Sequence, residues 1–205
     1  MIHAVITADI VNSTELHPDE EKTLMDSLQT VLSAHKFEFY RGDSFQVFIK
    51  DPKEALRVVL QCRTAAISVS EKPLFDVRSS IGIGTVETPI RKLATAKGEA
   101  FILSGRAFDK LDGKRELFVI SVGKSEKTMT FAMRVIARYI DSIFHEITPK
   151  QAEVLFELLK GKTQQTVADE LKKSKSTISE MVSSAKWPEI ERVMEDYHNL
   201  INEIK

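Results

Sequence analysis

The chain has 205 residues, of which 42% are hydrophobic and 29% are charged, and its formal net charge at pH 7 is -1. This length and composition exclude a disordered chain and predict an ordered globular protein with room for two domains. The balanced charge excludes a strong general attraction to nucleic acid, so any affinity for DNA has to come from a local group of cations.

Two absences from the sequence bear on where the protein works. Cys62 is the single cysteine, which excludes an intramolecular disulfide and a cysteine-based zinc site. No signal peptide precedes the first strand, and no apolar run approaches the ~18 residues that span a bilayer. We therefore expect a cytoplasmic protein without membrane contact.

The first part of the chain predicts alternating strands and helices. The stretch from His3 to Ile10 is rich in Ala, Val and Ile and reads as a central strand, buried on both faces. Further elements are predicted in the order helix 17–36, strands 37–40 and 45–49 around an RGDS turn, helix 51–70, strand 77–86, helix 98–111 and strand 117–122, with an optional return strand before Phe131. This order predicts a sheet with helices on one face, a ferredoxin-like α+β fold.

A long helix is expected to join this sheet to the last part of the chain. Apolar residues recur with a period of 3.6 from Phe131 to Phe144, and no Gly- or Pro-rich linker interrupts them. We predict an α+β domain over residues 1–128, a fairly stiff connecting helix over 129–147 and an all-α domain over 148–205.

The last part of the chain carries start and stop signals for three consecutive helices. Thr148 with Gln151 forms a capping box, and Gly161 can end the first helix in the left-handed conformation. Thr163 can cap the second helix and Ser174 the third. Trp187 and Pro188 are expected to end the third helix, and residues 189–204 form a last amphipathic helix that supplies core and some dimer contact.

Two short helices joined by a tight turn are typical of a helix-turn-helix, whose second helix enters the DNA major groove. Its polar face suits DNA, because Ser, Thr and Lys near a helix N-terminus reach phosphates and base edges. The alternative is a helical bundle with a polar outer face, which the turn KKSK favours because such turns usually carry Gly. The residues predicted to bind DNA are Gln164, Gln165, Lys172, Lys173, Lys175, Ser176, Thr177, Ser179 and Glu180.

Three stretches in the first part of the chain, ADIVNST, RGDSFQVFI and VRSSIGIG, resemble the metal-binding strand, the hairpin and the following strand of class III nucleotidyl cyclases. The helix GEAFILSGRAFDKL resembles the cyclase segment that comes next. The resemblance implies that Asp9 and Asp43 hold Mg²⁺ or Mn²⁺, hard cations that take oxygen ligands and recruit nucleotide phosphates. It also implies that Arg106 neutralises phosphate charge. Without a metal, both aspartates would be turn or capping residues.

Departures from the cyclase pattern argue against catalysis. The cyclase asparagine four residues before the arginine is Ile102 here, and the base-recognising lysine corresponds to Phe39. Neither side chain can donate a hydrogen bond. The sequence therefore predicts a cyclase-like domain without cyclase activity.

Taken together, the cyclase-like segments followed by a TP-x-Q helix and a helix-turn-helix resemble the SatD family of small bacterial proteins. That resemblance implies a DNA-binding transcriptional regulator, which we expect to act as a homodimer on double-stranded DNA and to take a metal or nucleotide effector. The alternative is a Mg²⁺-dependent nucleotide-binding enzyme or sensor whose helical domain binds another protein.

Overall fold

A five-stranded sheet forms the centre of the protein. The computed structural model describes residues 2–40, 42–72, 74–111, 116–123 and 127–204. The strands are β1 (Ile2–Val11), β2 (Lys36–Tyr40), β3 (Ser44–Ile49), β4 (Asp76–Thr85) and β5 (Phe118–Val122), in the sheet order β2-β3-β1-β4-β5. Among the strands of the described residues, only β4 and β5 pair in parallel. The predicted central position of the first strand is confirmed, since β1 lies between β3 and β4.

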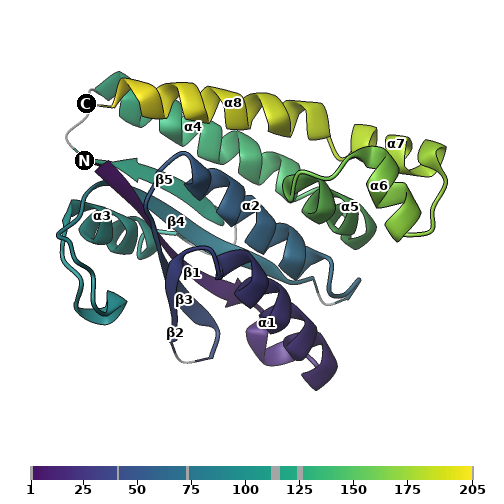
Figure 1. Ribbon diagram of the computed structural model, residues 1–205, viewed down its shortest axis with the longest axis horizontal. Helices are drawn as coiled ribbons and strands as arrows, with labels where there is room; N and C mark the ends of the chain where they lie inside the picture. The colour runs from purple at the N-terminus through teal and green to yellow at the C-terminus, as the bar shows by residue number, and fades with distance from the viewer. Residues whose placement is uncertain (1, 41, 73, 112–115, 124–126, 205) are drawn as a thin grey trace.

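Helices account for most of the remaining chain and give a mixed α/β structure (Figure 1). Two of the helices that connect strands are α1 (Pro18–Leu32), between β1 and β2, and α2 (Glu54–Ile67), between β3 and β4. The others are α3 (Glu99–Phe108), α4 (Lys127–Phe144), α5 (Pro149–Leu159), α6 (Gln164–Glu170), α7 (Lys175–Ser184) and α8 (Trp187–Glu203), with short 3-10 turns at Ser13–Glu15 and Leu93–Thr95. That the sheet and its helices form a ferredoxin-like fold stays a prediction.

Helices cover both faces of the sheet, so the prediction that they lie on one face was wrong. Ile6 and Ile81 pair across β1 and β4 and belong to the buried core on the side of α2. On the opposite face α3 packs closely, because Gly82 has no side chain: a Cβ there would lie 2.3 Å from the backbone oxygen of Ala100. Ser80 fixes this approach by donating to the backbone oxygen of Ser104 at 2.7 Å. The small and hydroxyl residues on this face of β4 therefore form a helix-docking surface.

The optional return strand before Phe131 is also wrong within the described residues, because the chain is helical from Lys127 onward. This helix, α4, buries Met133, Ile136 and Ile140 and packs beside the edge strand β5. The apolar face of α4 covers the edge of the sheet at β5, in the place where the predicted return strand would have paired. Arg41 of the predicted RGDS turn lies outside the described residues.

The last part of the chain forms helices whose ends match most of the predicted signals. The Thr148 and Gln151 capping box is present, the Thr163 and Ser174 side chains accept the N3 amides, and Gly161 has a φ of 86°. Trp187 and Pro188 do not end the third helix but begin α8. The reason is Lys186, whose left-handed φ of 57° ends one helix before Pro188 enters the first turn of the next.

The buried side chains of the sheet and of the C-terminal helices form one continuous hydrophobic cluster. Helix α8 docks on the start of α2, where the Tyr197 hydroxyl donates to the backbone oxygen of Pro52 at 2.8 Å. Gln61 of α2 donates to the backbone oxygen of Leu159 at 3.2 Å. Because the two parts share this core, the prediction that a separate domain begins at residue 148 stays a prediction.

A buried arginine joins four elements at the centre of the molecule. The Arg63 side chain of α2 is fully buried, and it donates to Asp76 at 2.7 and 2.9 Å and to Asp141 of α4 at 2.6 Å. Asp141 also accepts the amides of Leu117 and Phe118 at the start of β5. Burial by itself would lower the pKa of Arg63, but the two carboxylates outweigh it and raise that pKa. This network fixes α2, β4, β5 and α4 relative to one another.

Candidate functional site

The predicted metal ligands Asp9 and Asp43 lie at the ends of neighbouring strands. Asp9 pairs across β1 and β3 with Ser44, the residue that follows Asp43. The amide of Ile10 donates to the backbone oxygen of Asp43 at 3.1 Å. The strand pairing therefore brings the two segments together, as the resemblance to cyclases requires.

The carboxylate of Asp9 already has a cationic partner. Arg78 pairs directly with Asp9 across β1 and β4, and its guanidinium donates from Nη2 at 2.5 Å and from Nε at 3.1 Å. The guanidinium also lies 4.8 Å from the centre of the Phe108 ring. The hydrogen bond to Asp9 and the charge of that carboxylate raise the pKa of Arg78. Arg78 therefore donates one hydrogen bond to each Asp9 oxygen and offsets the charge of that carboxylate.

Asp43 accepts hydrogen bonds from hydroxyl groups. Its Oδ2 accepts from Ser13 at 2.9 Å and its Oδ1 from Ser44 at 3.3 Å. Among the described residues, no group of three or more His, Cys, Asp or Glu side chains is arranged to hold a metal ion. A divalent cation at Asp9 would have to share this carboxylate with Arg78, and metal binding by this pair stays a prediction.

Arg106 lines a groove that the C-terminal half of α3 forms with neighbouring elements. The groove has a volume of about 500 Å³ and runs between α3, β5 and α4, where Arg106 and Lys110 face Arg134 and Arg138. Asp9 and Asp43 are not among its lining residues. Glu116 offsets part of the positive charge, since it accepts from Arg138 at 3.1 and 3.2 Å. The lining of this groove thus does not bring the predicted phosphate-binding arginine together with the predicted metal ligands.

Phe39, the residue compared with the base-recognising lysine of cyclases, packs toward the core and not on the side of the sheet that carries Asp9. Phe39 pairs with Phe45, whose ring centre is 5.5 Å away, and Phe45 is buried in the core. The side chains that alternate with Phe39 are Glu38 and Tyr40, and the Tyr40 hydroxyl donates to Glu38 at 2.8 Å. Glu38 also accepts the Leu93 amide at 2.8 Å. Phe39 therefore lies on the same side of the strand pair as the buried Phe45, which the sheet register reveals and sequence spacing does not.

The second candidate region is the outer face of α7. Its buried stripe contains Ile178 and Val182, and its N-terminus is closed by Ser174, which accepts the amide of Thr177 at 3.1 Å. The opposite face is exposed and polar, and consists of Lys175, Ser176, Ser179, Glu180 and Ser183. Thr177 differs from the other predicted contacts, because it is half-buried and its hydroxyl lies 2.8 Å from that of Ser174.

The remaining predicted contacts lie around the segment that joins α6 to α7. Gln165 is exposed and donates to Asp169 at 3.0 Å, whereas Gln164 is half-buried. The left-handed turn residue is Lys172, with a φ of 53°. The turn thus adopts the conformation for which helix-turn-helix proteins commonly use glycine, although the sequence there is KKSK.

Most lysines in this region are paired with carboxylates of the protein. Lys162 lies 2.7 Å from Glu157 and 2.5 Å from Glu170, and Lys173 lies 3.6 Å from Glu153. Partial burial of Glu157 opposes its ionisation, but Lys162 and Lys160 outweigh burial and lower its pKa. These pairs reduce the local positive charge, which leaves Lys172 and Lys175 as the exposed cations nearest the turn.

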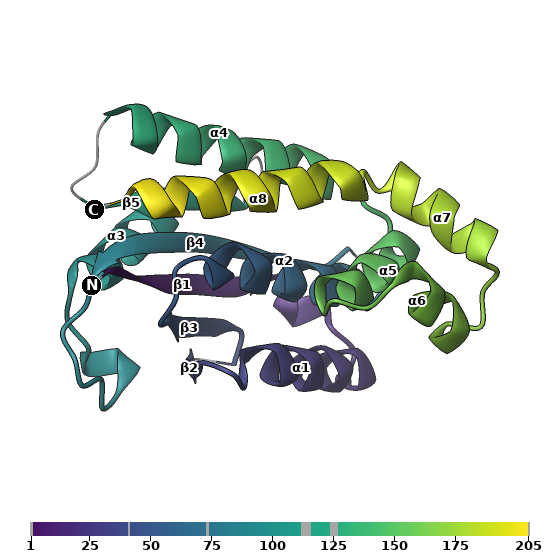
Figure 2. The same cartoon turned by 45° about the horizontal axis from the view of Figure 1, so that its top comes forward.

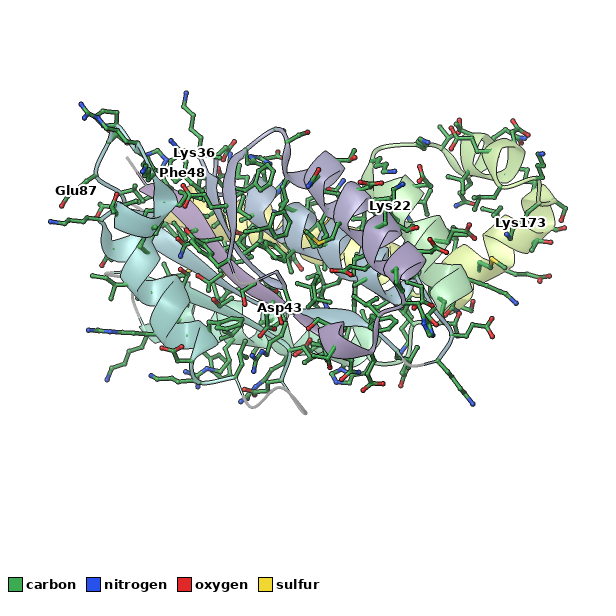
Figure 3. The ribbon with its side chains drawn as sticks, turned by 90° about the horizontal axis from the view of Figure 1, so that it is seen from below. Lys22, Lys36, Asp43, Phe48, Glu87 and Lys173 are labelled. Carbon is green, nitrogen blue, oxygen red and sulfur yellow. The ribbon has the colours of Figure 1, made fainter. Side chains whose placement is uncertain are left out.

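The two candidate regions lie in different parts of the molecule. Figure 3 shows Asp43 near the middle of the molecule and Lys173 at the end formed by the C-terminal helices. A metal ion near Asp43 would therefore not touch the face of α7.

None of the helices that the structure describes is both long and apolar enough to cross a membrane.

Solved structures that resemble this chain include bacterial adenylyl cyclases at low identity. One, a bacterial light-regulated adenylyl cyclase, is 12% identical, covers 58% of this chain and 74% of its own, and gives a TM-score of 0.39. Another structure of a bacterial light-regulated adenylyl cyclase is 12% identical over 58% of this chain and 42% of its own, with a TM-score of 0.36. No protein-family model and no curated protein matches the sequence. Membership of the SatD family stays a prediction from the sequence motifs.

Proposed function

We propose that the protein is a cytoplasmic DNA-binding transcriptional regulator that contacts the major groove through α7. The observation that carries the proposal is the exposed polar face of α7, which follows a capped N-terminus and a left-handed turn. Hydroxyl and ammonium groups on the first turns of such a helix can reach phosphates and base edges. The order of motifs that resembles the SatD family supports the same function.

The charges around α7 predict modest, salt-sensitive affinity. The chain as a whole has a net charge of -1, and Lys173 is held near Glu153 before any DNA arrives. Each phosphate contact adds about one unit to the slope of log affinity against log salt concentration. One short helix reads few base pairs, so two copies on half-sites about 34 Å apart would supply the affinity that a single helix lacks.

Fluorescence anisotropy with labelled genomic fragments tests the roles of individual residues. Lys173→Ala should weaken binding to all sequences alike and reduce the salt slope by about one. Lys150→Ala is the matched control, because Lys150 is also a surface lysine of this region and lies 3.5 Å from Glu71. Equal effects of the two substitutions would show that Lys173 is not part of the DNA-binding surface. Ser176→Ala and Glu180→Ala should instead change which sequences are preferred.

A second candidate function is sensing of an anionic ligand, and the basic groove beside α3 favours it. Arg106 and Lys110 project into a groove of about 500 Å³ that is large enough for a nucleotide-sized molecule. In this alternative the helical part would bind another protein. Calorimetry with ATP and GTP would test it, because binding in wild type that is lost in Arg106→Ala is the expected signature.

A further inference from the structure

Helix α4 presents a line of large apolar side chains to solvent. Phe131 is 65% exposed, Val135 49% and Tyr139 43%, whereas only two other large hydrophobic side chains among the described residues are comparably exposed. The three residues are spaced by four, so they lie along one side of the helix. Single exposed apolar residues are ordinary, but a contiguous line of them marks a binding surface.

The apolar line continues into a groove between α4 and α8. These helices run side by side in opposite directions (Figures 1 and 2). The groove has a volume of about 550 Å³, and Phe131 and Val135 line it together with Leu200 of α8. Asp196 and Glu203 form its outer rim and are exposed. The α8 side of the apolar line is therefore acidic.

The other side of the apolar line is basic. Arg134 and Arg138 of α4 are exposed and line the groove that faces α3 and β5, away from α8. The Arg138 bond to Glu116 is a surface pair, with side chains 64% and 47% exposed, so it leaves the arginine available for another partner. From α8 to α3, the surface thus changes from acidic through apolar to basic.

A surface with this order of charges is complementary to itself. Rotation by a half-turn about an axis that runs along the apolar line places the basic flank of one copy over the acidic flank of the other, and apolar side chains meet in the middle. A different partner would need to match all three zones separately. We infer that the α4 and α8 face binds a second copy of this chain in a two-fold symmetric dimer. The inference does not depend on DNA binding.

Sedimentation equilibrium of the full chain tests this interface. Wild type should be a dimer at micromolar concentration, and Phe131→Glu or Tyr139→Glu should raise the dissociation constant roughly tenfold or more, as expected for central aromatic residues. Ile102→Glu is the matched control, because Ile102 is 54% exposed but lies on α3. A monomeric wild type at 100 µM, or a Phe131→Glu variant that associates like wild type, would overturn the inference.

Charge reversal and cross-linking keep the inference testable if an apolar substitution disturbs folding. Arg134→Glu with Arg138→Glu should weaken association, as should Asp196→Arg with Glu203→Arg, and combining all four should restore it. Val135→Cys should form a disulfide-linked dimer on oxidation, since Cys62 is buried and does not compete. An Ile102→Cys control should stay uncrosslinked. Failure of the combined charge reversal to restore association, or equal cross-linking at both positions, would contradict a two-fold interface here.

Discussion

Lys172 occupies a backbone position that glycine usually fills. Its amide donates to Asp169, and the next amide donates to Ala168 at 2.9 Å, which closes the α6 C-terminus in a Schellman motif. Gly161 closes α5 through the same pair of bonds, with a φ of 86° against 53° for Lys172. A residue with a Cβ pays about 1 kcal/mol for this conformation.

Lys172→Gly should therefore stabilise the protein by about 0.5–1 kcal/mol, after allowance for the greater freedom of glycine in the unfolded chain. The reciprocal substitution Gly161→Lys should cost about 1 kcal/mol. No atom lies within 4 Å of a Cβ built at Gly161, so this cost would come from the backbone conformation alone. Urea denaturation measures both effects, and the same sign for both would contradict the conformational explanation.

Arg78 controls whether Asp9 can bind a metal ion. Both Asp9 oxygens accept from its guanidinium, so Mg²⁺ or Mn²⁺ has to compete with a cation that is already in place. We predict a small thermal shift with Mg²⁺ in wild type and a larger one in Arg78→Met. A free ion concentration ten times the dissociation constant would add about 1.4 kcal/mol to the free energy of unfolding.

Asp43→Asn in the Arg78→Met background is the control for this metal prediction, because it removes one charged ligand and keeps the strand pairing. It should abolish the added stabilisation. If Arg78→Met responds to Mg²⁺ no more than wild type does, Asp9 and Asp43 are structural residues whose carboxylates accept hydrogen bonds from their arginine and serine partners.

At the level of elements, the buried Arg63 holds α2, β4 and α4 together. Arg63→Met would leave Asp76 and Asp141 without their cation, and breaking a buried ion pair in this way costs about 3–5 kcal/mol. Arg138→Met removes the exposed pair with Glu116 and should cost less than about 1 kcal/mol. Chemical denaturation of the two variants provides the comparison, and similar losses would show that Arg63 is not needed to bring these elements together.

The individual strands and helices were largely predictable because their signals are local. Caps such as Thr148, Thr163 and Ser174 depend on residues three positions away, and the alternation in β4 depends on its own sequence. Arg63 could not be recognised as buried, since its partners lie 13 and 78 residues further along the chain. The docking of α3 escaped prediction for the same reason, because it depends on the approach of Ser80 and Gly82 to a distant helix.

The candidate sites were predictable only in part. Spacing correctly brought Asp9 and Asp43 to neighbouring strand ends, but it gave no information on which residue faces Asp9 from β4. The sheet register supplies Arg78 as that neighbour, and it places Phe39 on the core side of the sheet. Sequence spacing therefore locates a site along the chain, whereas pairing across strands determines its chemistry.

At the level of the whole molecule, the position of α7 is fixed by the core it shares with the sheet. The Tyr197 bond to Pro52 and the His198 contact with the Lys53 backbone oxygen at 3.1 Å anchor α8 on α2. Helix α7 precedes α8 and lies at the outer end of the helical part (Figure 1). A dimer through α4 and α8 would therefore hold two α7 helices at one defined separation, which a half-site spacing on DNA would have to match.

Binding of selected genomic DNA fragments to a triple variant tests the proposed DNA-binding function most directly. Fragments retained by wild type should bind Lys173→Ala, Lys175→Ala, Ser176→Ala at least about tenfold more weakly, because two phosphate contacts and a base contact are lost together. A control with two lysines and a serine replaced outside α5 to α8, at Lys22, Lys92 and Ser33, should bind like wild type. If the α7 triple variant binds these fragments as tightly as wild type does, α7 is not the DNA-binding surface.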